Sequence, residues 1–326
     1  MKALLLQDKG LWKDMRVGEV PKPEPGPGEL LIQVHAVGLN PVDYKTATGG
    51  NPNWTYPHIL GLDTAGVVAE TGEGVTGWQK GDRVVVHGDL TRKGGYAEYT
   101  TALAHAVSRI PEGISFEDAA ALPTAGYTAY QALFRKLPMD RVRTILLHGG
   151  AGGVGGFGVQ LAKNAGKTVF STASPANHDY VRSLGADHVI DYAGEDVAAK
   201  VLELTEGRGV DAVVDAVSRQ SATDSLDMLA YMGHIVYIAG PPDFTKIKGF
   251  TKVVSYHEIA LAAAYTYGDR ADQADLAAIG DEMLAMLQKG ALSSMLKEVI
   301  PLEEVPAALE RLSVRHVKGK MVAKLK

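Results

Sequence analysis

A run of glycines after residue 148 constrains the fold of this chain more than any other feature. The segment Gly150-Ala-Gly152-Gly153-Val154-Gly155 follows an apolar stretch, 144–148, and opens a helix-like stretch, 154–165. A strand, a G-x-G-x-x-G turn and a helix make up the phosphate-binding unit of the Rossmann fold. The first glycine permits the tight turn, the second lets the backbone approach a pyrophosphate, and the third lets the helix pack on the strand. The helix N-terminus offers free N–H groups and about half a positive charge. The pattern predicts dinucleotide binding; the alternative is a flexible loop.

The chain around this motif alternates between two kinds of segment. Strand-like stretches are expected at 144–148, 168–172, 188–191, 212–215 and 234–239, and helix-like stretches at 154–165, 178–184, 197–205 and 221–229. This βαβ rhythm predicts an α/β fold with a doubly wound parallel sheet, which a further apolar strand near 258–264 would complete.

The two ends of the chain have a different pattern. Short β-rich runs at 29–37, 65–70 and 82–87, separated by Gly- and Pro-rich segments, indicate a compact β-barrel-like domain. A helical stretch begins near 115. The tail, with an amphipathic segment at 276–289 and the closing KGKMVAKLK, is expected to return to the first domain.

Composition excludes several classes of function. At 326 residues the chain exceeds what one core usually organises, so two domains are expected. It has no cysteine, which excludes disulfides, thiolate zinc sites and iron–sulfur clusters. A net charge of -5 argues against nucleic acid or anionic lipid as partners. The apolar run at the N-terminus is too short for a signal peptide or membrane span, so we expect a cytoplasmic protein without a membrane partner.

The end of the second strand indicates which dinucleotide binds. An NAD enzyme usually places Asp or Glu there for the ribose hydroxyls. This chain has Ser171-Thr172-Ala173-Ser174-Pro175, with Asn177 and His178 just beyond. Without a carboxylate, nothing repels a 2′-phosphate, and the hydroxyl, amide and imidazole groups can hydrogen-bond to it. NADPH is therefore the expected cofactor. Alternatively, Ser174 before Pro175 only caps the following helix.

Segments along the whole chain then resemble one family. In order they are GLNPVDYK, GLDTAGVV, GDRV, GGYAEY, AAALPTAGYTAYQAL, GGAGGVGGFGVQLAK, LGADHVIDY and KGKMV. They resemble the zinc-independent quinone-oxidoreductase branch of the medium-chain dehydrogenase/reductase family. The resemblance implies a GroES-like, β-rich catalytic domain, 1–122 and 268–326, with a Rossmann NADP-binding domain, 123–267, inserted between its parts. It also implies a homodimer paired through the Rossmann sheets, with 259–264 as the apolar edge strand.

The same resemblance implies metal-free chemistry. Zinc-dependent relatives carry Cys where this chain has Asn40, and Gly-His-Glu where it has Gly61-Leu62-Asp63. No metal site is therefore expected, and the protein must position reduced nicotinamide against an electrophile that already accepts hydride. A quinone or an α,β-unsaturated carbonyl compound meets that demand.

The resemblance also assigns site residues. Asn40 is expected to fix the nicotinamide, Tyr44 or Lys45 to contact substrate or donate a proton, and Thr124 to bind the nicotinamide ribose or amide. The further positions expected to contact cofactor are Ser174, Asn177 and Tyr192 at the adenosine phosphate and Ala239 and Gly240 at the nicotinamide. Asn177 replaces a common Lys, which leaves His178 or Arg315 to supply positive charge. Trp54 and Tyr56 are expected to form an aromatic wall. Alternatives remain: a proton from water, Tyr44 and Lys45 as an exposed loop pair, Trp54 and Tyr56 as ordinary packing, and Thr124 as a helix cap.

Three functions stay open from the sequence. The first is an NADPH-dependent quinone or enone reductase. The second is a zinc-type alcohol or aldehyde dehydrogenase of the same superfamily, and the third is a non-catalytic NADPH-binding sensor or structural protein.

Overall fold

The computed structural model describes residues 1–314 and 317–326. The chain divides into two compact units, one formed by Met1–Tyr127 with Leu261–Lys326 and the other by Thr128–Ala260. The domain boundaries expected from the sequence, after residues 122 and 267, differ from both boundaries of these compact units. They stay a proposal for the functional domains.

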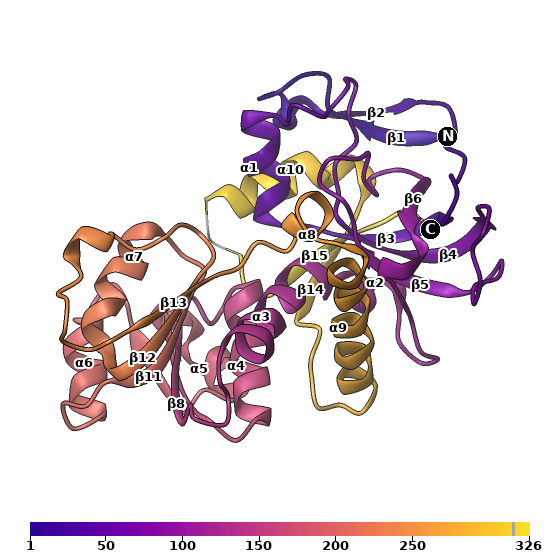
Figure 1. Ribbon diagram of the computed structural model, residues 1–326. Helices are drawn as coiled ribbons and strands as arrows, with labels where there is room; N and C mark the ends of the chain where they lie inside the picture. The colour runs from indigo at the N-terminus through magenta and orange to yellow at the C-terminus, as the bar shows by residue number, and fades with distance from the viewer. Residues whose placement is uncertain (315–316) are drawn as a thin grey trace. The chain divides into compact units, whose positions relative to one another are not determined.

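The unit formed by Thr128–Ala260 is a Rossmann-type α/β layer structure. Its six strands lie in the order β10-β9-β8-β11-β12-β13, and every pair is parallel. The strands are β8 (Thr144–Leu147), β9 (Thr168–Ala173), β10 (His188–Asp191), β11 (Val210–Asp215), β12 (Leu229–Tyr237) and β13 (Ser255–Glu258). The helices that follow its strands are α4 (Gly153–Asn164), α5 (His178–Ser183), α6 (Val197–Leu204) and α7 (Arg219–Asp224), drawn beside the sheet in Figure 1. The doubly wound parallel sheet is confirmed.

The last strand of this sheet differs from the sequence-based expectation. The strand predicted at 258–264 is wrong: β13 ends at Glu258, and Ala263–Thr266 forms the short helix α8. Four of the residues from 260 to 264 are alanine, which favours helix over strand. Ile259 and Leu261 are buried, so they do not form an exposed apolar edge.

The other unit is built around a mostly antiparallel sheet. Its order is β14-β15-β3-β4-β5-β7, with β6 also paired to β3. The strands are β3 (Glu29–Gly38), β4 (Asp63–Thr71), β5 (Arg83–His87), β6 (Tyr99–Leu103), β7 (Val107–Arg109), β14 (Leu296–Pro301) and β15 (Lys320–Lys324); β1 (Lys2–Leu5) and β2 (Arg16–Glu19) form a separate hairpin. Because β15 pairs with β3, the expected return of the tail to the N-terminal part is confirmed.

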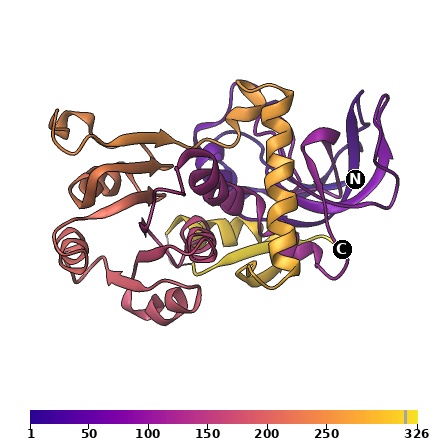
Figure 2. The ribbon, with the colours of Figure 1, turned by 60° about the horizontal axis from the view of Figure 1, so that its bottom comes forward.

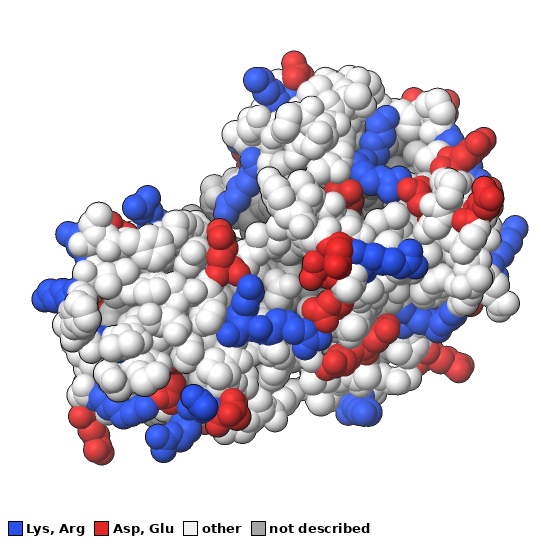
Figure 3. Space-filling view, viewed as in Figure 1, with Lys and Arg blue, Asp and Glu red and all other residues white. Residues whose placement is uncertain are grey.

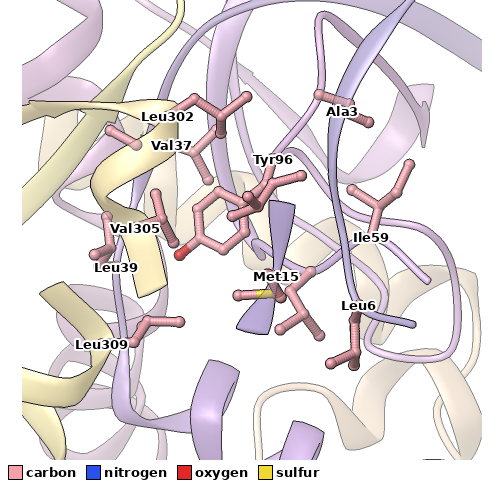
Figure 4. Packing of buried hydrophobic residues seen from close by; sticks show 14 of the residues in the cluster. Ala3, Leu6, Met15, Val37, Leu39, Ile59, Tyr96, Leu302, Val305 and Leu309 are labelled. Atoms are coloured by element: carbon pink, nitrogen blue, oxygen red, sulfur yellow. The ribbon is translucent and has the colours of Figure 1, made fainter. Parts of the chain in front are cut away.

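Helices cover this sheet and close its core. The long helix α9 (Arg270–Gln288), the orange helix in Figure 2, packs along β7 and the turn before it. The helices α1 (Pro41–Gly49) and α10 (Val305–Ser313) pack against each other. Tyr96 lies fully buried in a cluster with Val37, Leu39 and Val305, drawn in Figure 4.

The helical stretch expected from residue 115 is interrupted. It forms α2 (Phe116–Ala120), a π-helical turn at Pro123–Tyr127 and α3 (Thr128–Gln131). Pro123 has no N–H to donate to the preceding turn, which explains the break. The π-helical turn places Thr124 beside β4, where its side chain meets Asp63.

Charged side chains of both signs are mixed on the surface. Lys and Arg are interspersed with Asp and Glu on the face of each unit seen in Figure 3. Among the described residues, no helix is long and apolar enough to cross a membrane.

Candidate functional site

The glycine-rich turn between β8 and α4 is tightly packed at its first and last glycines. The Gly150 amide donates to Thr172 O at 3.0 Å, which ties the turn to the end of β9. A Cβ on Gly150 would lie 2.2 Å from Ser171 Oγ, and one on Gly155 would lie 2.3 Å from Gly149 O. Both positions therefore require glycine for the packing of the turn itself.

Gly152 differs from these two glycines. Its φ of -86° suits any residue, and a Cβ there would meet nothing closer than Gly149 O at 3.4 Å. The space in front of it lies at the N-terminus of α4, which begins at Gly153 without a side-chain cap. The first amides of the helix, including those of Val154 and Gly155, have no partners from a preceding turn. This geometry fits a dinucleotide pyrophosphate.

A buried histidine supports the turn from below. The Gly149 amide donates to Thr172 Oγ1 at 3.0 Å, and His148 Nδ1 lies 3.2 Å from the same hydroxyl. On its other side, His148 Nε2 lies 2.9 Å from Ser225 Oγ, whose proton goes to Ser221 O. Burial lowers the pKa of His148. A neutral ring with its proton on Nε2 satisfies every bond, so Thr172 donates to Nδ1 and accepts from Gly149.

The residues expected at the adenosine phosphate gather at the carboxyl ends of β9 and β10. Asn177 Nδ2 donates to Ser174 Oγ at 3.1 Å. His178 Nε2 lies 3.2 Å from Ala173 O. Tyr192, 60% exposed, follows Asp191, whose Cα pairs with that of Ala173.

The side chains at the end of β9 differ from the sequence-based expectation in two ways. Ser174 makes no side-chain cap, so the alternative that it only caps the next helix is wrong. Ala173 is 2% exposed, so the first position with a side chain open to a ligand is Ser174. Arg315, the other expected source of charge, lies outside the described residues.

Ala239 and Gly240 lie beyond the strand that they were expected to end. β12 ends at Tyr237, although the Ile238 amide still donates to Asp215 O at 2.9 Å. Ala239 is exposed, and Gly240 has a φ of +135°, which favours glycine. The chain therefore turns sharply at the carboxyl edge of the sheet.

A second group of candidate residues forms a buried polar cluster in the other unit. Asn40 is 1% exposed, and its side-chain amide bridges two charged groups. Lys320 Nζ donates to Asn40 Oδ1 at 2.5 Å, and Asn40 Nδ2 donates to Asp63 Oδ2 at 2.7 Å. Both ends of the amide are thus engaged within the unit. The expected contact of Asn40 with nicotinamide stays a prediction, and these hydrogen bonds do not provide for it.

Asp63 also holds Thr124. Its Oδ1 accepts from the Thr124 amide at 2.9 Å and from the Thr124 hydroxyl at 2.6 Å. Thr124 lies within a π-helical turn, so its alternative role as a helix cap is wrong. The Thr124 side chain is partly exposed, which leaves its oxygen open to a ligand.

Asp43 is a buried carboxyl group next to this cluster. Its Oδ2 accepts from the backbone N–H of Asn40 at 2.8 Å and from Tyr96 OH at 3.1 Å. Burial raises the pKa of Asp43 to about 7, with Asp63 adding to the effect. The pKa of the Lys320 ammonium is lowered by burial, against the attraction of Asp63 and Asp43.

The predicted catalytic pair lies on α1 rather than on a loop. Tyr44 packs against Trp12, with ring centroids 5.7 Å apart, whereas Lys45 is exposed. The alternative of an exposed loop pair is therefore wrong for Tyr44. Of the aromatic wall, Trp54 is buried and stacks on His58 at 4.1 Å beside a small pocket that Asp43 also lines, while Tyr56 is at the surface.

The sequence does not predict the buried roles of three members of the cluster, Asp43, Asp63 and Lys320. They lie far apart in the chain, and each is visible in the sequence only as part of a motif or as a replaced ligand. Lysine in KGKMV gave no signal of burial. Only the pairing of β15 with β3 brings it beside Asn40.

Comparison with known proteins agrees with this architecture. The model of the alcohol dehydrogenase GroES-like domain matches residues 26–112, and that of zinc-binding dehydrogenases matches residues 153–281. A quinone oxidoreductase from Pseudomonas aeruginosa is 33% identical over 305 residues, which cover 92% of each chain. A trans-enoyl reductase from Aspergillus flavipes is 39% identical over 212 residues, and the match spans 60% of this chain and 61% of that relative.

Solved structures are similar over the full length. A putative zinc-dependent alcohol dehydrogenase from Rhizobium etli has a TM-score of 0.92 at 30% identity, covering 100% of this chain and 98% of that one. A mycobacterial protein complexed with NADPH has a TM-score of 0.87 at 30% identity, with 100% of both chains covered.

The inserted parallel sheet, its glycine turn and the GroES-like unit define the class. The chain belongs to the medium-chain dehydrogenase/reductase family. It is an oxidoreductase of that family, whose members bind a nicotinamide cofactor, and it is similar to the quinone oxidoreductases among them.

The family includes zinc enzymes. The positions where zinc-dependent relatives carry Cys and His ligands are occupied here by Asn40 and Leu62. The amide of Asn40 is committed to Lys320 and Asp63, and Leu62 is a buried apolar side chain. In residues 1–314 and 317–326, no three His, Asp or Glu side chains are grouped to hold a metal ion.

Proposed function

We propose that the protein transfers hydride from NADPH to a quinone or an α,β-unsaturated carbonyl compound without a metal ion. The observation that carries the proposal is the open position at Gly152, where the turn has no packing reason for glycine and only a ligand would require it. The bound cofactor would supply the hydride. The described residues bind and orient it.

The choice of NADPH depends on the carboxyl end of β9. Ser174 and Asn177 offer neutral hydrogen-bonding groups there, and no acid occupies positions 171–178. A neutral hydrogen bond to phosphate has roughly half the strength of a charge-assisted one, so we expect a modest preference for NADPH over NADH.

The substrate class follows from what the GroES-like unit supplies. At the zinc-ligand positions the unit carries an amide and a leucine, so a substrate that needs a Lewis acid is disfavoured. Quinones and enones accept hydride at a conjugated carbon. Lys45, exposed on α1, is the proposed group to stabilise the developing oxygen charge or donate a proton, and Tyr44 is the second candidate.

The alcohol dehydrogenase alternative has support from the similar Rhizobium etli structure and from the name of one family model. The test is a panel of quinones, enones, saturated ketones and aldehydes with NADPH and NADH, following the absorbance of the reduced nicotinamide. We expect turnover of the quinones and enones only. Faster reduction of saturated carbonyls that depends on added zinc would refute the proposal.

The cofactor assignment is tested with two variants of the β9 end. Asn177→Lys adds a charge-assisted bond and should tighten NADPH more than NADH. Ser174→Asp should favour NADH, and the two changes together span on the order of a hundredfold in the affinity ratio, since about 1.4 kcal/mol is tenfold. Arg182→Lys, on the exposed face of α5, is the control that should leave the ratio unchanged. Dissociation constants are measured at one ionic strength because salt screens the phosphate. If both variants leave the ratio unchanged, the 2′-phosphate binds elsewhere.

We also propose a homodimer that pairs the Rossmann sheets through β13. This strand is one of the two outer strands of its sheet, with β10 at the other edge, and the exposed side chains of Tyr231, Met232 and Phe250 belong to the same unit. An unpaired outer strand beside exposed apolar groups favours pairing with a second copy.

A further inference from the structure

The buried polar cluster fixes the direction of each of its hydrogen bonds. The Lys320 ammonium has three donors and no acceptor, so the Asn40 atom that faces it at 2.5 Å must be the amide oxygen. The amide NH2 group of Asn40 therefore faces Asp63. A second bond from Lys320, to Leu39 O at 3.1 Å, holds the ammonium in place.

The same logic continues to Thr124. Asp63 receives N–H donors on both oxygens, from Asn40 on Oδ2 and from the Thr124 amide on Oδ1. The carboxylate is thus the acceptor, and the Thr124 hydroxyl donates its single proton to it at 2.6 Å. Only lone pairs remain on Thr124 Oγ1. A ligand that approaches this oxygen must bring its own N–H or O–H.

Lys320 is the residue that maintains this arrangement. It is 3% exposed and is the cation that interacts with both carboxyl groups, Asp43 and Asp63. Without the Lys320 ammonium, Asn40 would lose the donor that keeps its amide oxygen turned away from Asp63, and Asp63 would be a buried carboxylate without that cation beside it. The acceptor that holds the Thr124 proton would then no longer be fixed in place, and Thr124 would be free to turn its proton outward.

We propose that Lys320 is a positioning residue that holds the Thr124 hydroxyl as a pure hydrogen-bond acceptor for a donor on the nicotinamide nucleoside. The proposal deepens the proposed function, since it depends on Thr124 bordering the cofactor. Two donors have the required chemistry: the carboxamide N–H and a hydroxyl of the nicotinamide ribose.

The test compares binding of NADPH with that of its 3-acetylpyridine analogue, which has no amide N–H. Dissociation constants are measured by fluorescence titration without substrate, so the readout does not depend on turnover. We expect the wild-type protein to bind NADPH about tenfold more tightly, as one hydrogen bond lost at a partly buried acceptor predicts. Thr124→Val should bring this ratio close to one, and Thr124→Ser should retain it.

Lys320 is tested in the same way. Lys320→Gln keeps a donor for Asn40 but removes the charge and should lose the discrimination; Lys320→Arg keeps the charge and should restore it. Thermal unfolding monitors the fold, because a purely structural role would lower the melting temperature and leave the ratio of dissociation constants unchanged. If Lys320→Gln does not fold, Lys320→Arg and the Thr124 pair still decide the ratio.

The possible outcomes separate the two proposals. If the acetylpyridine analogue binds as well as NADPH, an analogue lacking a ribose hydroxyl is tested, and discrimination there assigns the ribose as the donor. The inference is overturned if the ratio of dissociation constants of analogue to NADPH is the same for wild type, Thr124→Val and Lys320→Gln with both analogues. A protein that binds no reduced nicotinamide overturns the proposed function instead.

Discussion

Asp43 gives the most direct physical test of the cluster around Asn40. The carboxyl group is 2% exposed, and burial raises its pKa from 3.8 to about 7. Between these values the folded protein holds a proton that the unfolded chain has released. Stability contributed by Asp43 is therefore present at low pH and is lost as the pH rises through about 7.

The magnitude follows from the shift. About three pKa units at about 1.4 kcal/mol each give a loss of about 4 kcal/mol between pH 4 and pH 8. Asp43→Asn keeps the carbonyl oxygen that accepts from Asn40 and Tyr96 but does not titrate. Its free energy of unfolding relative to wild type should therefore rise by about 4 kcal/mol over this range and be constant above it.

Urea unfolding followed by tryptophan fluorescence measures this difference. All three tryptophans, Trp12, Trp54 and Trp78, belong to the unit that contains Asp43, so the signal reports the correct part of the chain. Buried histidines with lowered pKa values, such as His58 and His87, lose stability in acid in both proteins and cancel in the comparison.

Asp82 is a matched control of the opposite sign. The hydrogen bond from Arg109 lowers its pKa, so its contribution to stability is lost as the pH falls below about 4. Asp82→Asn should therefore differ from wild type only above that range. A free-energy difference for Asp43→Asn that does not change with pH would show that its carboxyl group is not desolvated as described.

Three further predictions concern the cofactor turn, metal and assembly. Gly155→Ala should lower the melting temperature, because its Cβ would lie 2.3 Å from Gly149 O. Gly152→Ala should leave the melting temperature unchanged but weaken binding of the reduced cofactor by at least tenfold. Equal effects of the two variants on the melting temperature would contradict the assignment of Gly152 to the ligand. Dialysis against a strong chelator should leave turnover unchanged, and activity that only zinc restores would show that a metal site has been missed. Light scattering at micromolar concentration should give the mass of a dimer, and Ser255→Pro in β13 should shift it to monomer; a wild-type monomer would refute the pairing.

Local sequence pattern predicted the Rossmann unit well. Apolar strands such as Thr144–Leu147 are short runs bounded by turn residues, and His188–Asp191 was predicted with its observed bounds. The glycine turn was predicted in position because its strand, glycine spacing and helix all lie within one short stretch of the chain. The error at 258–264 has a local cause as well, since alanines there count as apolar in a strand pattern yet favour helix.

The cluster of Lys320, Asn40 and Asp63 was not predictable in the same way. Its members are separated by up to 280 positions, and the Lys320–Asn40 bond depends on the pairing of β15 with β3. The sequence showed that Cys and His ligands were replaced but gave no indication that a buried ammonium would compensate the remaining carboxyl groups. To predict the contact of Lys320 with Asn40, one must know how β15 pairs with β3, two strands far apart in the chain.

The position of β15 has a consequence for how the chain folds during synthesis. All six strands of the Rossmann sheet lie between Thr144 and Glu258, so that sheet is complete once this stretch has left the ribosome. The first 127 residues are made earlier, and β6 pairs with Glu29–Gln33 of β3, but the Ala36–Gly38 end of that edge stays unpaired until Lys320–Lys324 is made, after the Rossmann stretch. The Lys320 ammonium that bonds to Asn40 arrives at the same time. The second unit in the chain is therefore the first able to finish folding, and the first unit depends on sequence-distant contacts that form slowly.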